Sequence, residues 1–387
     1  MIRLAVSEFR CYRSAVVELD PEGPRPVVLT GPNGAGKTNL LEAVSFLAPG
    51  RGLRGARLGA VDRRLPGGDG EGEGGGHAGG SWAVAARLLR GAEIVEVGTG
   101  RDPAVDPDTP RARRIVKIDG TQCSQAGLAE VAAICWLTPQ MDRLFLEGAG
   151  ERRRFLDRLV FCFDPAHAAR VSAYEQAIRE RMRLLSDGVG DAAWLAALEE
   201  QAAAHGVAVA AARRDLAARL DRVAAEAEGP FPQAAIALAG AVEAWLDEMP
   251  ALAAEETLRD RLAESRAQDA EAGSTRWGPH RSDLVVAHRA RGMPAAECST
   301  GEQKALLIAI LLAHARLQAA AHGASPILLL DEVAAHLDAS RRRALFETLV
   351  DLGAQAWLTG TDEALFADLR GAAQFFRVRD ATIAAAA

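Results

Sequence analysis

The sequence predicts an α/β fold with an antiparallel side sheet and a compact helical lobe. Three observations lead to this prediction. A glycine-rich motif, Gly31–Thr38, lies between an expected strand and an expected helix. An apolar run, Ile327–Leu330, ends in two carboxylates, as a buried strand of a parallel sheet does. The alanine-rich stretch from about Glu151 to Ala272 repeats its apolar residues with a helical period.

Composition excludes several classes of protein. With 387 residues, 49% of them hydrophobic and 25% charged, the chain is long enough for two or three globular domains. The net charge of −7 excludes a uniformly basic nucleic-acid coat, so any DNA contact must be regional. The five cysteines form no CxxC pair, which indicates reduced cytosolic thiols and neither a disulfide framework nor a zinc knuckle. Charge occurs too early for a signal peptide, and the apolar stretch Ala305–Ala313 is short of the ~18 residues of a membrane span.

The N-terminal third is expected to be rich in strands. A first strand, a turn around residues 20–23 and a second strand over 26–30 precede the glycine-rich loop and its helix. Three further β-like runs, 82–89, 93–97 and 115–118, predict the antiparallel side sheet. The insertions Gly67–Gly80 and Asp102–Pro110 are expected to be loops, and no function is inferred from them.

The remainder divides into a helical lobe and a return to strand character. Residues 141–274 are expected to form the helical lobe, while 1–140 and 275–387 form the other lobe. A strand over 283–287, a helix from Gly301 and a last strand over 355–359 follow. The tail ends in a plain alanine run.

The motif Gly31–Thr38 fits the GxxxxGK[ST] pattern of a phosphate-binding loop. Its glycines allow backbone N–H groups to curl around phosphate oxygens at a helix N-terminus. Lys37 is expected to reach the β and γ phosphates of ATP, and the Thr38 hydroxyl to ligate Mg²⁺. The complete set of predicted phosphate-loop residues is Gly31, Pro32, Asn33, Gly34, Ala35, Gly36, Lys37 and Thr38.

Two acidic residues follow the apolar strand. The end of a buried parallel strand lies at the sheet edge where ligands collect. Asp331 is therefore expected to hold Mg²⁺ through water, and Glu332 to orient and deprotonate an attacking water. An acidic pair after an apolar run is also common in purely structural settings, so this prediction depends on the phosphate loop.

A third motif, Ser299–Lys304, opens an apolar helix. One interpretation is structural: Ser299 or Thr300 caps the helix, with a capping-box acid or amide behind it. The other is functional, because the same geometry directs free N–H groups and a serine hydroxyl at an anion. Only three of the 45 basic residues are lysines, and two of these, Lys37 and Lys304, fall in motifs.

The order of these motifs resembles that of the ATP-binding-cassette ATPases, in which the signature serine touches the γ-phosphate held by a second subunit. Within that superfamily the chain resembles the RecF family of bacterial recombination mediators over its full length. The segments that carry this resemblance are EFRCYR at 8–13, GPNGAGKTNLLEAVSFLAPGR at 31–51, ERRRFLD at 151–157, GPHRSDL at 278–284, STGEQK at 299–304 and LLLDEVAAHLD at 328–338.

The resemblance implies a slow ATPase of DNA replication, recombination, repair and the SOS response, located in the cytoplasm with the nucleoid. ATP would close a homodimer around double-stranded DNA near single-strand gaps, and RecR with RecO would help RecA to load. It further implies nucleotide contacts at Ser299, Gly301, Gln303 and Asp338. Gln140 would reach Mg²⁺ or the attacking water, although a solvent-facing loop residue is an equal alternative. No histidine occurs after residue 350 to act as the superfamily's switch residue, and Thr359-Gly360-Thr361 stands in its place.

DNA contacts are expected to involve the phosphate backbone, because no aromatic residues alternate with the basic ones. The candidates are Arg51, Arg54 and Arg57, then Arg111, Arg113, Arg114 and Lys117, with further clusters at 152–154 and 341–343. The alternatives are an SMC-type chromosome clamp, disfavoured by the absence of long heptads, and another soluble cassette ATPase. A phosphate-loop kinase would leave the 299–304 motif without a role.

Overall fold

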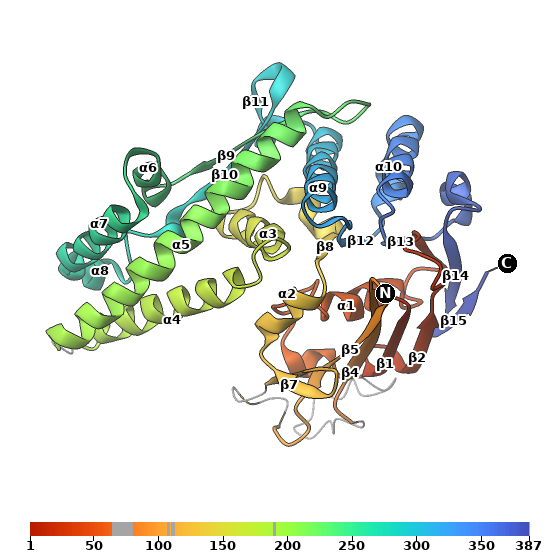
Figure 1. The fold of residues 1–387 in the computed structure, drawn as a ribbon, viewed down its shortest axis with the longest axis horizontal. Helices are drawn as coiled ribbons and strands as arrows, with labels where there is room; N and C mark the ends of the chain where they lie inside the picture. Colours follow the sequence, from red (N-terminus) through yellow and green to blue (C-terminus); the bar gives the residue numbers. More distant parts are fainter. Residues whose placement is uncertain (64–79, 107–108, 110–112, 189–190, 387) are drawn as a thin grey trace, which may run out of the picture. The chain divides into compact units, whose positions relative to one another are not determined.

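The computed structural model describes residues 1–63, 80–106, 109, 113–188 and 191–386. The chain forms two compact units (Figure 1), Met1–Met141 with Gln318–Ala387, and Asp142–Leu317. The first boundary lies within one residue of the expected one. The second differs, since residues 275–317 belong to the unit that contains the helical segment. The reason is strand pairing, because β10 (Asp283–His288) pairs with β9 (Ala234–Ala239), which lies inside that segment.

The core of the first unit is a six-stranded sheet in the order β15-β14-β3-β13-β12-β8. All of its strands are parallel except β15, which pairs antiparallel with β14. The carboxyl ends of the parallel strands therefore meet at one edge, where ligands of α/β sheets bind. The strands are β3 (Val27–Thr30), β8 (Ile134–Leu137), β12 (Ile327–Leu330), β13 (Ala356–Gly360), β14 (Gln374–Arg379) and β15 (Thr382–Ala385), and the helices of this unit are α1 (Lys37–Ser45), α2 (Leu128–Val131) and α10 (Ala339–Asp351).

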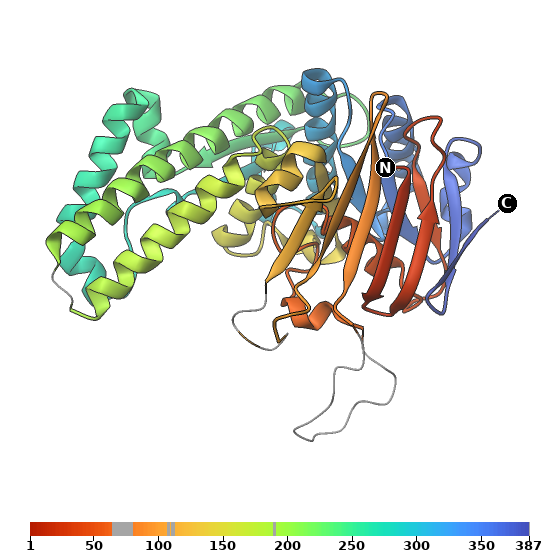
Figure 2. The ribbon, with the colours of Figure 1, turned by 60° about the horizontal axis from the view of Figure 1, so that its bottom comes forward.

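The predicted antiparallel side sheet is confirmed and has six strands in the order β2-β1-β4-β5-β6-β7 (Figure 2). Its inner face packs on an aromatic cluster, in which Phe9, Phe46 and Trp82 have ring centroids 4.7–5.9 Å apart. Phe46 directly follows α1, so this cluster fixes the phosphate-loop helix against the sheet. The strands are β1 (Arg3–Phe9), β2 (Tyr12–Glu18), β4 (Ala83–Arg90), β5 (Glu93–Arg101), β6 (Arg114–Ile118) and β7 (Thr121–Cys123).

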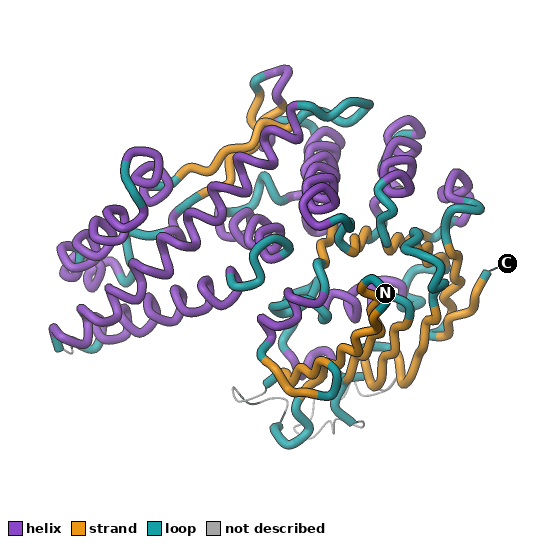
Figure 3. Tube along the Cα trace, viewed as in Figure 1, coloured by secondary structure: helices purple, strands orange, loops and turns teal. Residues whose placement is uncertain are grey.

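The second unit is mainly helical (Figure 3) and includes the predicted helical lobe. Its longest element, α5, has 34 residues, and Asp191 caps it by accepting the backbone N–H groups of Ala193 and Trp194. Breaks occur near the expected positions at 187–188, 229–230 and 250. The helices are α3 (Ala149–Phe161), α4 (His167–Ser186), α5 (Ala192–Ala225), α6 (Ala241–Glu248), α7 (Ala251–Glu264) and α8 (Arg266–Ala272), together with most of α9 (Thr300–His322).

Two predictions about strands were wrong. The helical segment contains β9, which forms a three-stranded sheet with β10 and β11 (Met293–Pro294). The strand expected over 355–359 is not the last one, because β14 and β15 follow β13 in the core sheet. Four of the six residues of β9 are alanines and only Ile236 is β-branched, so its composition favoured a helix. The insertion 67–79 and residues 107–108 and 110 lie outside the described residues.

Helix α9 is the one helix in the described parts of the chain that is long and apolar enough to cross a membrane by length and composition. In the most apolar window of this helix, 61% of the residues are buried inside the protein. This burial is what a core helix requires.

Candidate functional site

The phosphate loop connects β3 to α1, and two of its glycines leave no room for a side chain. Gly31 has a φ of +150°, and a Cβ placed on it would lie 2.0 Å from the carbonyl oxygen of Val378. Gly36 has a φ of +114°, and its Cβ would lie 2.5 Å from the Tyr12 hydroxyl. Only glycine fits both positions. The loop leads directly into α1, whose N-terminal N–H groups and positive dipole end favour an anion.

Lys37, the first residue of α1, folds back over this loop. Its Nζ donates to the carbonyl oxygens of Gly31 at 2.7 Å and Pro32 at 2.9 Å. Since an ammonium has three donors, one remains for a phosphate oxygen. Burial lowers the pKa of Lys37, and the neighbouring carboxylates of Glu332 and Asp331 partly oppose this shift. The ammonium and both carboxylates therefore lie at the same edge of the sheet.

Asp331, directly after β12, accepts hydrogen bonds from two hydroxyl groups. Thr38 Oγ1 lies 2.9 Å from Asp331 Oδ1 and 3.1 Å from Oδ2, and Thr359 Oγ1 lies 2.7 Å from Oδ1. Asp331 is only 5% exposed. A hydroxyl and a carboxylate are hard oxygen donors of the kind that Mg²⁺ prefers, so Thr38 and Asp331 suit the metal role expected of them.

Glu332 follows in a strained turn. Its φ of 52° places it in the left-handed region, which costs a residue with a side chain about 1–3 kcal/mol. Its backbone N–H donates to Thr359 Oγ1 at 2.9 Å. One hydroxyl thus accepts from Glu332 and donates to Asp331, which fixes the two acidic residues relative to each other. Backbone strain held in this way is typical of functional turns.

The other loop residues and Gln140 lie at the same edge. Ala35 donates its backbone N–H to Pro32 and accepts that of Ala381, while Asn33 and Gly34 are exposed. Gln140 is exposed in the turn Pro139–Arg143 after β8. Because the backbone N–H of Asp331 donates to the Leu137 carbonyl at 3.0 Å, the ends of β8 and β12 are adjacent. Gln140 therefore follows the strand next to the one that ends at Asp331.

The start of α9 is an exposed capping box. Ser299 Oγ lies 2.9 Å from Glu302 Oε2, and the Ser299 backbone N–H donates to the same oxygen at 3.0 Å. These two bonds hold the pKa of Glu302 below its usual value. The capping alternative left open by the sequence is thus present. Since Ser299, Thr300 and Gly301 are all exposed, this helix end also remains accessible to an anionic partner.

Two other residues of the expected nucleotide contacts have local partners. Gln303 is 3% exposed, and its Nε2 donates to the Cys298 carbonyl at 2.8 Å. This differs from the predicted direct contact with nucleotide, because the side chain holds the segment before Ser299 instead. Asp338 caps α10 by accepting the backbone N–H of Arg341 at 2.9 Å.

The predicted DNA-contacting arginines divide into exposed and buried groups. Arg51, Arg54 and Arg57 are exposed in the segment after α1, and Arg54 Nη1 also donates to Asn39 and Glu42. The side chain of Arg113 is 69% exposed and pairs with Asp102. Arg111 lies outside the described residues.

The prediction for Arg114 was wrong. This residue is 8% exposed, and its guanidinium donates to the backbone carbonyls of Phe46, Ala48 and Gly50. Burial lowers its pKa to about 9. Arg114 therefore anchors the segment after α1 and is not available to a DNA phosphate.

The arginine run at 152–154 is also structural. Arg152 makes two bonds of 2.7 Å to the Asp283 carboxylate, and Arg153 donates to the Ser282 carbonyl at 2.6 Å. Arg154 pairs with Glu151 in its own helix. The segments 151–157 and 278–284, both among those that carry the family resemblance, thus bind each other within the second unit.

Sequence reasoning missed three residues that support the phosphate loop. Tyr12 donates its hydroxyl to the Gly36 carbonyl at 3.1 Å. Glu42, which is fully buried, accepts two bonds from Arg10. Thr359 was noted only as standing where a switch histidine would be. The one signal in the sequence was Glu42, an acidic residue on the inner face of the helix after the phosphate loop, because a buried carboxylate needs a cation such as Arg10 as its partner.

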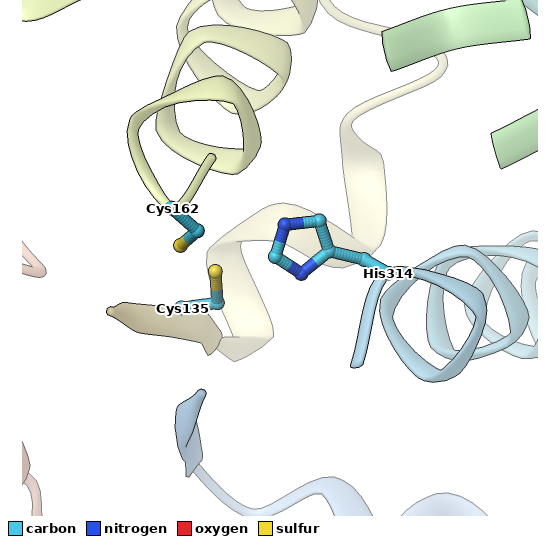
Figure 4. Close-up of side chains that lie close together, drawn as sticks. All are labelled: Cys135, Cys162 and His314. Atoms are coloured by element: carbon cyan, nitrogen blue, oxygen red, sulfur yellow. The ribbon is translucent and has the colours of Figure 1, made fainter. Parts of the chain in front are cut away.

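All five cysteines are free thiols in the structure. Figure 4 labels Cys162 and His314 of the second unit, which both bond to carbonyls of α3. His314 Nε2 lies 3.0 Å from the Leu159 oxygen, and Cys162 Sγ lies 3.7 Å from the Arg158 oxygen. These backbone contacts account for both side chains. Cys135, also labelled, belongs to the first unit, and we derive no metal site from the three.

Two protein-family models match separate stretches of the chain, one with the phosphate loop and one with the Asp331–Glu332 pair. Residues 3–61 match a model described as an AAA domain, and residues 213–361 match one described as AAA domain, putative AbiEii toxin, Type IV TA system. The chain is 50% identical over 383 residues to the DNA replication and repair protein RecF of Brucella suis, covering 97% of this chain and 94% of that protein. It is 49% identical over 386 residues to RecF of Mesorhizobium japonicum, covering 98% and 96%.

Solved structures share the fold. A structure of the recombination mediator protein RecF with ATP, from the RecFOR pathway, matches with a TM-score of 0.81 at 20% identity, covering 100% of this chain and 97% of that one. The Smc head domain of Pyrococcus furiosus matches with a TM-score of 0.51 at 15% identity, covering 100% and 95%. The predicted α/β fold with an antiparallel side sheet and a helical lobe is thereby confirmed as the fold of the RecF and Smc head structures.

Proposed function

Because this chain belongs to the RecF family of DNA replication and repair proteins, we propose that it binds Mg·ATP at Gly31–Thr38 and uses ATP to close a homodimer around double-stranded DNA beside single-strand gaps. ATP acts here as a ligand of the dimer that the monomer binds less completely, which shifts association by mass action. The protein is placed in the cytoplasm with the nucleoid, where RecR and RecO would use the closed state to load RecA.

The dimer proposal rests on one observation. The signature motif at the start of α9 is exposed, and the sequence contains only one phosphate-loop motif. The sequence contains one GxxxxGK[ST] motif and one SxGEQ motif. Ser299–Gly301 are exposed at a helix N-terminus and are free to meet the γ-phosphate on another copy. A complete nucleotide site therefore requires two chains, each providing a phosphate loop and a signature end.

Each side chain at the sheet edge then has a defined role in hydrolysis. Lys37 holds the β and γ phosphates with its spare N–H donor. Thr38 and Asp331 would hold Mg²⁺, which would neutralise developing phosphate charge. Glu332 orients the attacking water and accepts its proton, while Gln140 lies on the neighbouring strand end to assist that water. Thr359 keeps the Asp331–Glu332 turn in place.

The proposal is tested by sedimentation velocity of the Glu332→Gln variant with Mg·ATP and a fluorescent gapped duplex. Since this variant keeps the phosphate contacts but lacks the carboxylate base, it should accumulate as a dimer that carries the DNA. The matched control is Lys37→Ala, which should stay monomeric and leave the DNA free. Rapid ATP turnover by Glu332→Gln would contradict the role of this carboxylate, and a monomer at saturating ATP would contradict the dimer.

DNA contact is proposed for Arg51 and Arg57, which are exposed on the segment held by Arg114. Replacing both by alanine should weaken duplex binding and reduce the salt dependence by about two counterions, since each phosphate contact releases roughly one. The control is Arg90→Ala on the exposed β4–β5 hairpin of the same unit. Fluorescence anisotropy at a series of salt concentrations gives, for each variant, the slope of the logarithm of the DNA-binding constant against the logarithm of the salt concentration. Equal slopes for the two variants would show that Arg51 and Arg57 do not contact DNA phosphates.

A further inference from the structure

The longest part of the chain without a lysine or arginine lies in the second unit. Residues 223–258 contain seven acidic residues and no basic one, although the whole chain has 45 basic residues. This segment runs from the end of α5 through β9 and α6 into α7. A surface built from it has no cation of its own to offer to a phosphate backbone, so it is unsuited to DNA.

On α6 and α7, three carboxylates of this segment keep an unpaired negative charge. Glu248 ends α6, and Glu255 and Glu256 lie in the second turn of α7. Within the described parts of the chain, none of the three side chains has an ion-pair or hydrogen-bond partner. The next cations on α7, Arg259 and Arg261, already pair with acidic residues of their own helix. The surface of α6 and of the first half of α7 is therefore acidic.

Apolar side chains are exposed within this acidic surface. Leu252, in the first turn of α7, is 69% exposed, more than any other large hydrophobic side chain in the described parts of the chain. Met249, three residues earlier, is half-buried. Trp245 of α6 is also half-buried and stacks on Trp277, with ring centroids 5.9 Å apart. Tryptophan and methionine are enriched in protein interfaces, and apolar surface with a polar rim marks interaction sites.

The charge of this surface indicates what kind of partner fits it. DNA and anionic lipid would be repelled by the unpaired carboxylates, and so would the same surface of a second copy of this chain. A protein that carries lysines or arginines around an apolar side chain would instead be attracted during approach and would bury Leu252 after contact. Charge complementarity therefore favours a basic protein partner over the other three.

We infer that α6 and the first half of α7 form a docking surface for a basic protein partner. Leu252 is its apolar anchor, and Glu248, Glu255 and Glu256 are its acidic rim. The inference goes beyond the proposed function and rests on it only for the choice of RecR and RecO as probes. Because the surface includes no residue assigned to ATP or DNA, its variants should leave the affinity for a fluorescent ATP analogue unchanged.

Binding of labelled RecR and labelled RecO to the full chain tests the inference. Leu252→Ser should weaken the binding of one of them about tenfold or more, mainly through faster dissociation, because it removes the anchor. The double variant Glu255→Lys with Glu256→Lys should slow association several-fold at low salt. Its association rate should approach that of the wild type at high salt, where exposed charges are screened. Both changes concern solvent-facing positions, and circular dichroism confirms that the variants are folded.

The matched controls lie on α5 of the same unit. Trp194→Ala removes another exposed apolar side chain, which is 44% exposed, and Glu200→Lys reverses another exposed acidic residue. Both should bind the partner as the wild type does. If RecR or RecO binds the wild type and the Leu252 and Glu255/Glu256 variants equally well, the inference is overturned while the proposed function stands.

A second probe decides the case in which the wild type binds neither RecR nor RecO. That result would contradict the partners named in the proposed function, and a synthetic amphipathic helix of leucine and lysine then replaces them. The wild type and the two α5 controls should bind this peptide more tightly than Leu252→Ser and the double lysine variant do. Equal binding by all five proteins would show that α6 and α7 form no docking surface for a basic apolar partner.

Discussion

The two units use their buried charges differently. At the sheet edge of the first unit, Lys37 retains an unused donor and Glu332 occupies a strained turn. In the core of the second unit, Arg181 is completely buried and its guanidinium makes four hydrogen bonds, all to groups of that unit. It donates to Glu199 at 2.9 Å, to Asp269 at 2.8 Å and to the Leu262 carbonyl at 2.6 Å.

The difference separates charges that serve the fold from charges that serve a ligand. A fully buried cation that is paired with two carboxylates is closed to a ligand, so its contribution is to specify one packing of the helices. A partly paired ion on a constrained turn keeps bonding capacity at a cost in stability. Variants that remove one charge from each unit should therefore affect different quantities.

The largest effect is expected for Arg181→Met. This change leaves the carboxylates of Glu199 and Asp269 buried without their main cation, which should lower the free energy of unfolding by about 3–5 kcal/mol. Urea denaturation measures the loss. The control is Arg179→Met on the same helix, whose side chain is 66% exposed and whose pair with Glu175 should contribute under about 0.5 kcal/mol. Similar losses for the two variants would show that the buried network does not stabilise the second unit.

Lys37→Ala, in contrast to Arg181→Met, should weaken ATP binding and leave the stability of the protein almost unchanged. ATP affinity should fall by about ten- to a hundredfold, because hydrogen bonds to a charged group contribute about 1.5–3 kcal/mol. The free energy of unfolding should change little, since a partly desolvated ammonium is removed. Titration with a fluorescent ATP analogue measures the affinity, with Lys117→Ala as the control. A variant that is clearly less stable but keeps the ATP affinity of the wild type would show that Lys37 serves the fold and not the ligand.

The phosphate-binding edge could be predicted from sequence because its signals are local. GxxxxGK[ST] specifies a backbone shape through glycines, and Gly31 and Gly36 do lie where no Cβ fits. The apolar strand before Asp331 specifies burial, and parallel strands share one ligand edge. These features need only a few neighbouring residues.

The supporting contacts could not be predicted because they join distant residues of ordinary type. Thr359 lies 28 positions from Asp331, and nothing in its neighbourhood marks its hydroxyl. Arg114 was expected at a DNA surface because a basic run is usually exposed, whereas its partners are carbonyls 64–68 positions away. Burial of a charge depends on the tertiary fold, which periodicity and composition do not give.

Thr359→Val tests whether the strained turn needs its hydroxyl. The substitution keeps the shape of the side chain but removes two hydrogen bonds, each worth about 0.5–1.5 kcal/mol. We expect a modest loss of stability, a clear loss of kcat for ATP hydrolysis and nearly unchanged ATP affinity, because Lys37 and the loop are intact. Thr348→Val in α10 is the control, since its hydroxyl bonds only within its own helix. Unchanged kcat would show that Thr359 does not position Glu332.

The smallest effect concerns pH and the polar core of the second unit. His280 is partly buried; its Nδ1 accepts a hydrogen bond from the Tyr174 hydroxyl and its Nε2 donates to the Thr275 carbonyl at 2.9 Å, which employs both ring nitrogens of the neutral form. Burial lowers the pKa of His280, and the positive charges of Arg281 and Arg153 add to this shift.

Between the usual histidine pKa of about 6.5 and its lower value in the folded protein, the unfolded chain binds more protons. The stability that His280 contributes is therefore fully present above about pH 6.5 and declines as the pH falls through this window, by no more than about 1.4 kcal/mol per pH unit. His280→Gln should remove that part of the slope in urea denaturation at pH 7.5 and 5.5, whereas His336→Gln, at an exposed position of the first unit, should leave it unchanged. Equal slopes for His280→Gln and the wild type would mean that the ring takes up its proton as easily in the folded protein as in the unfolded chain, and that its contacts with Tyr174 and Thr275 tolerate a positive charge.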